Sequence, residues 1–249
     1  MNVEQVLHMN GGEGKKSYAS HSLYQVTLSL SLSLSLFQVL YTPIPVPEGL
    51  LREDRKDLNK GNICIAKTSP PAVHEAYFEQ FQRDFTTFLK CRAKELVPGS
   101  SMILTTMGCI KTDDPLNIWE LIGLKLYGMV LEGLIEEEKL DRFNLPFYAT
   151  SAEEVKKLVE GSFGLHKLES FKTDWETHIK KANNSLDSKE RAAIIAADIR
   201  TVAEPILVAH FGDKIMDKLF DRVGEDVLDH MLRYNCQNVN LVISLTKKG

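Results

Sequence analysis

The residues Asp141-Arg142-Phe143-Asn144 form the local cluster in this sequence with metal-binding chemistry. A carboxylate, a backbone carbonyl two residues on and a side-chain amide three residues on supply oxygen ligands of the kind that a hard cation such as Mg²⁺ takes. The same residue types are typical of a turn that ends a helix, where Asp and Asn side chains satisfy backbone groups. The residues by themselves favour the helix-ending turn over the metal site.

A glycine cluster near the start of the chain, Gly11, Gly12 and Gly14, could let the backbone approach a ligand. It is not a phosphate-binding loop, because two lysines separate Gly14 from Ser17 and the G-K-[ST] triplet is absent. The residues favour a surface turn.

The other reactive side chains show no catalytic or metal-binding spacing. The 7 histidines are scattered, and the 4 cysteines contain no C-x-x-C pair, which argues against a zinc site and a disulfide framework. That cysteine usage is typical of a reducing compartment, so we expect a cytoplasmic protein. No constellation supports catalysis by itself, and we assign no catalytic residue.

Composition narrows the class of partner. The net charge is −4 and 26% of the residues are charged, which argues against a nucleic-acid-binding surface. No charged segment followed by an apolar run indicates a signal peptide, and we expect no membrane-spanning segment.

Regular helical and strand patterns follow Ser69. Ser69-Pro70-Pro71 predicts a helix start, and the aromatic stripe after it predicts a core-facing helix. Further helices are predicted over 118–140, 191–211, with a kink or break at Pro205, and 213–231. Ser151 to Glu154 is a capping box that opens a short helix. Strands are predicted over 102–106, 163–171 and 239–245. This order predicts an α/β fold with a helical insertion after the first of these strands.

A Leu-Ser repeat, VTLSLSLSLSLF over 26–37, interrupts the chain. Its alternation has the period of a strand with one apolar face. A CT-dinucleotide repeat read in frame also encodes alternating Leu and Ser. We interpret the repeat as translated non-coding sequence.

Four segments together resemble the plant SABATH methyltransferases: VLHMNGGEGKKSYASHS, NKGNICIAKTSPP, EGLIEEEKLDRFNLP and VAEPILVAHFG. That family methylates salicylate, benzoate, jasmonate and related acids, and in some members xanthine alkaloids. The resemblance covers residues 1–25 and about 46–249. It implies a class I, Rossmann-like methyltransferase sheet with a helical cap, S-adenosylmethionine as methyl donor, and a small carboxylic acid as acceptor. A homodimer is a further expectation.

The resemblance also implies site residues. Tyr18 and Ser22 would lie near the donor. A second set would contact the acceptor, with Gln25 reaching its carboxylate: Asn10, Gln25, Met107, Ile118, Trp119 and Tyr148. Asp141, Phe143 and Asn144 match the family's magnesium-associated motif.

The chain departs from the family between Gln25 and Val46, where about 20 residues replace a far longer segment. The D-L-G-C-x-x-G-P-N donor loop, the acidic residue that holds the donor ribose and the first strands of the sheet are not found. We therefore expect three parts: the family segment 1–25, the low-complexity segment 26–45 in place of most of the donor-binding half, and 46–249, which keeps the rest of a truncated sheet and a cap over about 110–160 and 173–200.

The implied reaction needs no general base, because a carboxyl group with a pKa near ~4 is already ionised at neutral pH. Catalysis is then mainly the placement of two bound reactants. Two alternatives stay open: a catalytically dead remnant or mis-predicted gene product, and a xanthine nitrogen as acceptor.

Overall fold

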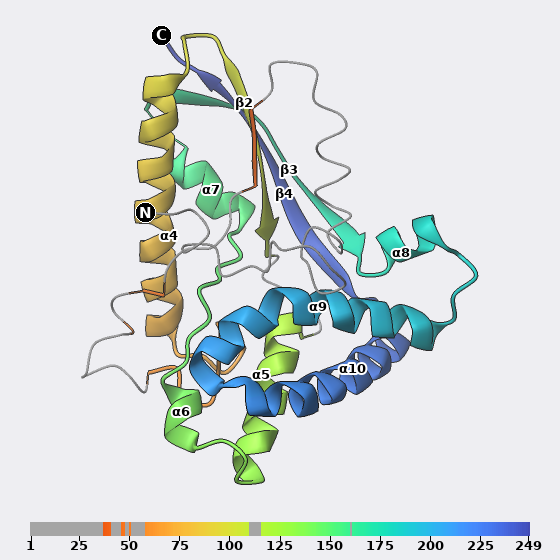
Figure 1. Ribbon diagram of the computed structural model, residues 1–249. Helices are drawn as coiled ribbons and strands as arrows, with labels where there is room; N and C mark the ends of the chain where they lie inside the picture. Colours follow the sequence, from red (N-terminus) through yellow and green to blue (C-terminus); the bar gives the residue numbers. More distant parts are fainter. Residues whose placement is uncertain (1–36, 41–45, 48–49, 51–57, 110–115, 160) are drawn as a thin grey trace. The chain divides into compact units, whose positions relative to one another are not determined.

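The computed structural model describes residues 37–40, 46–47, 50, 58–109, 116–159 and 161–249 (Figure 1). These residues fall into two compact units. The sheet unit comprises the described residues up to 109 together with 144–173 and 237–249, and the helical unit comprises 116–143 and 174–236. Each unit is described by itself. The predicted ranges of the cap stay a prediction, and the segments 1–25 and 26–45 lie outside the described residues except for 37–40.

The sheet unit contains four strands and two helices. Its elements are β1 (Phe37–Leu40), α4 (Pro71–Glu95), β2 (Ser101–Gly108), α7 (Ala152–Leu158), β3 (Phe163–Asp174) and β4 (Gln237–Lys247). The strand order is β1-β2-β4-β3. The strands predicted over 102–106, 163–171 and 239–245 are confirmed within β2, β3 and β4.

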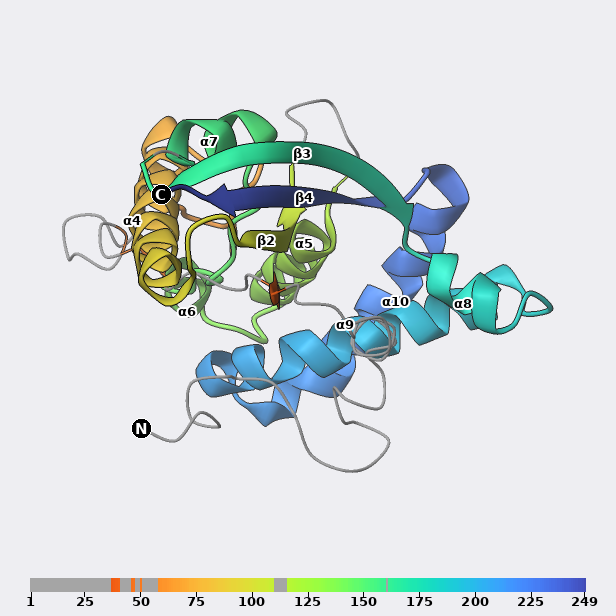
Figure 2. The same ribbon diagram turned by 90° about the horizontal axis from the view of Figure 1, so that it is seen from above.

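The sheet is mixed in direction. β1 runs parallel to β2, from the pair Phe37↔Met102 to Leu40↔Thr105. β2 and β4 are antiparallel over their length, from Ser101↔Thr246 to Gly108↔Val239. β3 runs opposite to β4 along its other side (Figures 1 and 2). The α/β prediction is confirmed.

The predicted aromatic stripe is the core-facing side of α4. Its helix begins at Pro71, where the missing N–H of proline costs nothing in the first turn. The stripe packs with apolar residues of β2, β4 and α7, and its buried members in α4 are Val73, Tyr77, Phe81, Phe85 and Leu89.

The helical unit contains α5 (Ile118–Leu131), α6 (Glu137–Asp141), α8 (Thr177–Ala182), α9 (Ser188–Phe211), the 3₁₀ turn η2 (Asp213–Ile215) and α10 (Met216–Arg233). The amphipathic pattern predicted for α10 is confirmed, because its apolar side is buried: Met216, Leu219, Phe220, Val223 and Val227. α10 packs with α9 and with α5.

One predicted helix is wrong in its extent. The helix predicted over 118–140 is two helices, because Gly133 takes a left-handed conformation with φ of 73° and ends α5. Of the kink or break predicted at Pro205, the break does not occur, since α9 runs through the proline from Ser188 to Phe211. The buried residues Ala203 and Leu207 on either side of the proline keep the helix packed.

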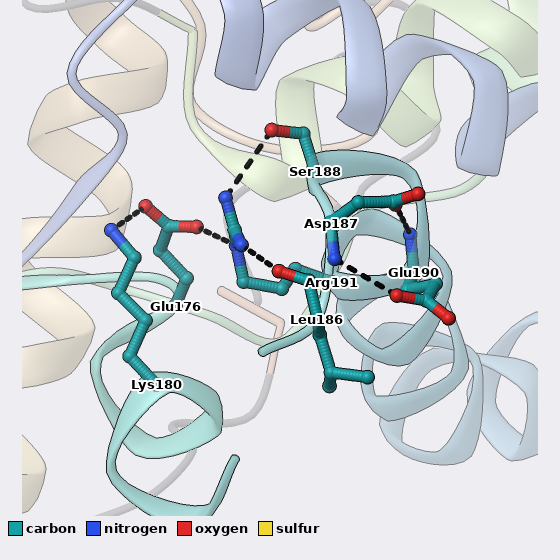
Figure 3. Close-up of polar contacts among 7 residues, drawn as sticks. All are labelled: Glu176, Lys180, Leu186, Asp187, Ser188, Glu190 and Arg191. Carbon is teal, nitrogen blue, oxygen red and sulfur yellow. Dashed lines mark hydrogen bonds and ion pairs between the residues drawn. The ribbon is translucent and has the colours of Figure 1, made fainter. Parts of the chain in front are cut away.

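A charged latch holds the start of α8 to α9 (Figure 3). The Glu176 carboxylate accepts from Arg191 Nε at 2.6 Å and also from Lys180 Nζ. Arg191 donates further to the Leu186 carbonyl and, at 3.2 Å, to Ser188 Oγ. The latch therefore ties the loop before α9 to the residue that caps α8.

Candidate functional site: the carboxyl end of strand β2

Ligands of α/β folds bind at the carboxyl ends of parallel strands. In the described structure β1 and β2 are the parallel pair, and the carboxyl end of β2 is Met107-Gly108. The Met107 side chain is 42% exposed. Gly108 has no room for a side chain, because a Cβ there would lie 2.7 Å from Leu241 Cγ on β4. The close approach of β4 fixes the backbone from which Met107 projects.

The segment 148–151 is held against this strand end. Gly108 forms a parallel bridge with Thr150, and the Cys109 N–H donates to the Thr150 carbonyl at 3.0 Å. Tyr148, two residues earlier, therefore lies near the carboxyl end of β2. The sheet unit brings the segments of two predicted acceptor-contact residues, Met107 and Tyr148, to one edge.

Tyr148 is half-buried and fixed on two sides. Its ring lies 5.4 Å from that of Phe81, centroid to centroid. Burial raises the pKa of the Tyr148 hydroxyl far above its usual range, and the charge and hydrogen bond of Glu154 raise this pKa further. Tyr148 is therefore a neutral hydroxyl at any physiological pH.

Glu154 connects this segment to α7. Its Oε2 accepts from the Ser151 N–H at 2.8 Å and from Thr150 Oγ1 at 3.2 Å, while Ser151 Oγ accepts from the Glu154 N–H at 3.3 Å. The predicted capping box is confirmed. The sequence showed the cap but gave no sign of the link from Glu154 to Tyr148.

In the helical unit, Ile118 and Trp119 form the first turn of α5 and are half-buried. Asn117 caps this turn, because its Oδ1 accepts from the N–H groups of Trp119 at 2.9 Å and Glu120 at 3.0 Å. Both predicted acceptor contacts thus lie on a well-formed helix start.

The residues predicted for magnesium take part in packing and hydrogen bonding. Asp141 is the buried last residue of α6, and the Phe143 ring lies 5.1 Å from the rings of His210 and Phe211. In the sheet unit, the buried Asn144 Oδ1 accepts from Asn59 Nδ2 at 3.1 Å. Among the described residues no group of three His, Cys, Asp or Glu side chains could hold a metal ion. The role of Asp141, Phe143 and Asn144 in binding magnesium stays a prediction.

Asn59 is a residue that sequence reasoning missed. It is 1% exposed, and its Nδ2 donates to Asn144 and, at 3.1 Å, to the Cys64 carbonyl, while its Oδ1 accepts from Ser69 Oγ at 2.7 Å. Ser69 Oγ accepts in turn from the Ala66 N–H at 2.9 Å. Spacing alone does not reveal such a network, because its partner Asn144 lies far away along the chain.

The remaining predicted site residues, Asn10, Tyr18, Ser22 and Gln25, lie outside the described residues. Their donor and acceptor contacts stay predictions.

Comparison with known proteins identifies the family. The model of the SAM dependent carboxyl methyltransferases matches residues 27–248. A probable jasmonic acid carboxyl methyltransferase from Theobroma cacao is 43% identical over 82% of this chain and 57% of its own length. A benzoic acid/salicylic acid carboxyl methyltransferase from Petunia hybrida is 42% identical over 81% of this chain and 55% of its own length. The chain thus spans little more than half the length of these relatives.

A solved structure supports the same assignment. Loganic acid methyltransferase with SAH superposes with a TM-score of 0.73 and 29% identity, covering 87% of this chain and 62% of that protein. The structural match and the sequence matches therefore point to the same family. The chain belongs to the SAM-dependent carboxyl methyltransferases, the SABATH family.

Proposed function

We propose that the chain carries the acceptor side of an S-adenosylmethionine-dependent methyltransferase that esterifies the carboxylate of a small plant acid. The family match over residues 27–248 carries this proposal. Relatives named for jasmonate, benzoate and salicylate favour an acid of that type as the acceptor.

A cytoplasmic location remains part of the proposal. No helix in the described part of the chain has the length and apolarity to cross a membrane.

The proposed role of the described residues is placement. S-adenosylmethionine, when bound, supplies an electrophilic methyl group. The acid arrives ionised, so the protein has to orient it and exclude water rather than remove a proton. Met107 and Tyr148 at the end of β2, and Ile118 and Trp119 at the start of α5, are the residues we propose for this placement.

The chain lacks the loop by which the family binds the methyl donor. The D-L-G-C-x-x-G-P-N loop is absent between Gln25 and Val46, and about 20 residues replace the segment that carries it in the family. This observation favours a second candidate function: a relative that binds acids without transferring a methyl group. We derive no step through the donor.

Calorimetry with the full chain separates these functions. Both predict binding of a small aromatic or oxylipin acid, and they differ in binding of S-adenosylhomocysteine. We expect the acid to bind and S-adenosylhomocysteine not to bind, which is the result of the second function. Micromolar affinity for S-adenosylhomocysteine would overturn the non-catalytic alternative. A folded chain that binds none of these acids would overturn the acceptor-side proposal.

The acceptor atom and the metal are separate questions. A probable caffeine synthase from Coffea canephora is 41% identical over 82% of this chain, which keeps a xanthine nitrogen as the alternative acceptor. Xanthine binding without acid binding would select that alternative.

Magnesium and a homodimer stay predictions. The magnesium prediction would be wrong if Asp141→Ala left unaltered the response to magnesium of a protein with its donor-binding segment restored. The homodimer prediction would be wrong if light scattering gave the mass of a monomer.

A further inference from the structure

The segment 144–150 is held to helix α4 shortly before it reaches Tyr148. The Leu145 carbonyl accepts from the Tyr77 hydroxyl at 2.8 Å, and the Leu145 N–H donates to the Ile63 carbonyl at 2.6 Å. All three of these residues are buried, and Tyr77 is 0% exposed. Burial raises the pKa of Tyr77 far above its usual range, so its hydroxyl is a neutral donor at any physiological pH.

The other end of the segment is held by the sheet, where Thr150 forms a parallel bridge with Gly108 at the carboxyl end of β2. Between the two ends, the ring of Tyr148 lies 5.4 Å from that of Phe81, centroid to centroid. Tyr77 and Phe81 are buried one helical turn apart on the same side of α4. α4 therefore contacts the segment twice, once at the backbone before Tyr148 and once at its ring.

The backbone contact lies at a tight turn. The Phe147 N–H donates at 2.8 Å to the same Leu145 carbonyl, which closes a three-residue turn around Pro146. Proline fixes its own φ, so a rotation of the Leu145 peptide would move the residues that follow, Tyr148 among them. The Tyr77 hydroxyl is the side-chain group that holds this carbonyl, and a phenylalanine there would keep the ring in the core but release the carbonyl.

We propose that Tyr77 is a positioning residue for the candidate acceptor edge: its hydroxyl holds the Leu145 carbonyl, which sets where Tyr148 lies at the carboxyl end of β2 and thereby the affinity for the acid. The inference rests on the proposed function, because it assumes that an acid contacts Tyr148. It goes further by adding a buried residue of α4 that acts on acid binding through Tyr148.

The test is a double-mutant cycle on acid affinity with the full chain, measured by calorimetry with salicylate, benzoate and jasmonate. Tyr77→Phe should weaken the binding of the tightest of these acids about two- to tenfold, the range of one neutral hydrogen bond. In a chain that already carries Tyr148→Ala, the same change should alter the affinity by less than about twofold, because the side chain that it positions is gone.

Leu89→Val is the control for a general loss of stability. Leu89 is buried on the same helix, about three turns beyond Tyr77. Removing one methylene group from a buried side chain destabilises the fold. This variant should lower the midpoint of thermal unfolding and leave acid affinity within about twofold. A loss of affinity as large as that of Tyr77→Phe would show that Tyr77 acts only through stability, which would overturn the inference.

The other outcomes are also distinguishable. Unchanged acid affinity in Tyr77→Phe, or an equal loss with and without Tyr148→Ala, would overturn this inference and leave the proposed function standing. Absence of all acid binding by the folded, unmodified chain would overturn both. If the Tyr148→Ala chain does not fold, Tyr148→Leu, which keeps an apolar side chain next to Phe81, takes its place in the cycle.

Discussion

Asn59 organises the loop that precedes α4. Its amide group satisfies the Cys64 carbonyl, Asn144 Oδ1 and Ser69 Oγ, and each of these bonds is buried. Buried polar groups contribute modestly when paired but are costly when one partner is removed. The network therefore fixes the path of the loop before α4 at the level of single side chains.

Replacing Asn59 with alanine should lower the free energy of unfolding by about 3 kcal/mol, because several buried groups lose their partner at ~1–3 kcal/mol each. Urea denaturation followed by circular dichroism measures the change. Asn62→Ala is the matched control, since the Asn62 side-chain bonds to Lys60 and Thr68 are exposed. Equal losses for both variants would contradict a structural role specific to Asn59.

Gly108 is the second residue with a sharp prediction. A Gly108→Ala side chain would meet Leu241 Cγ at 2.7 Å, and overpacking of a core costs about 1–3 kcal/mol. The same change at Gly164 on β3 should be harmless, because the nearest atoms there are 3.9 Å away. Thermal unfolding of the two variants tests this difference, and a neutral Gly108→Ala variant would show that β4 yields more easily than its packing indicates.

At the scale of elements, the attachment of α8 to α9 depends on one carboxylate. Burial raises the pKa of Glu176, yet hydrogen bonds from Lys180 and Arg191 outweigh it and leave the pKa below its usual 4.5. A lowered folded-state pKa stabilises the fold above the unfolded pKa, and this stabilisation is lost as the pH falls through the folded value. The latch should therefore be intact at neutral pH and released only in acid.

The variant Glu176→Gln should lose roughly 1–2 kcal/mol of stability at pH 7, between the value of an exposed ion pair and that of a charged hydrogen bond. The gap between variant and unmodified chain should shrink as the pH falls below 4.5 and through the lowered pKa of Glu176, because the carboxylate then becomes protonated. Glu169→Gln, at an exposed pair with Lys167, is the control and should change stability little. A gap of the same size at pH 3 and pH 7 would contradict the ionic origin of the latch.

Elements with a strong apolar period were predictable, and single-residue interruptions were not. The stripe of α4, the capping box at Ser151 and the apolar side of α10 follow directly from residue spacing. The end of α5 depends on the left-handed conformation of Gly133. A glycine can adopt this conformation but does not have to, so the sequence alone does not predict it. In the candidate site, family resemblance supplied Met107 and Tyr148, but the contact of Glu154 with Tyr148 forms only when the chain is folded.

At the scale of the whole molecule, we propose that the chain keeps the acceptor side of the family and has an altered donor side. The family match extends to residue 248, and the described sheet ends, on the β1 side, with a four-residue strand. We propose that residues 26–45 stand in place of the segment that carries the donor loop in the family. Methyl transfer needs both reactants aligned, because placement supplies roughly 7–11 kcal/mol of the catalytic effect.

Transfer of a radiolabelled methyl group from S-adenosylmethionine to salicylate, benzoate or jasmonate tests this account most directly. We predict no labelled ester from the chain as it stands. We predict an ester when a relative's donor-binding segment is restored between Gln25 and Val46. Labelled ester formed by the unmodified chain would contradict the account, as would a restored protein that binds the donor and still methylates no acid.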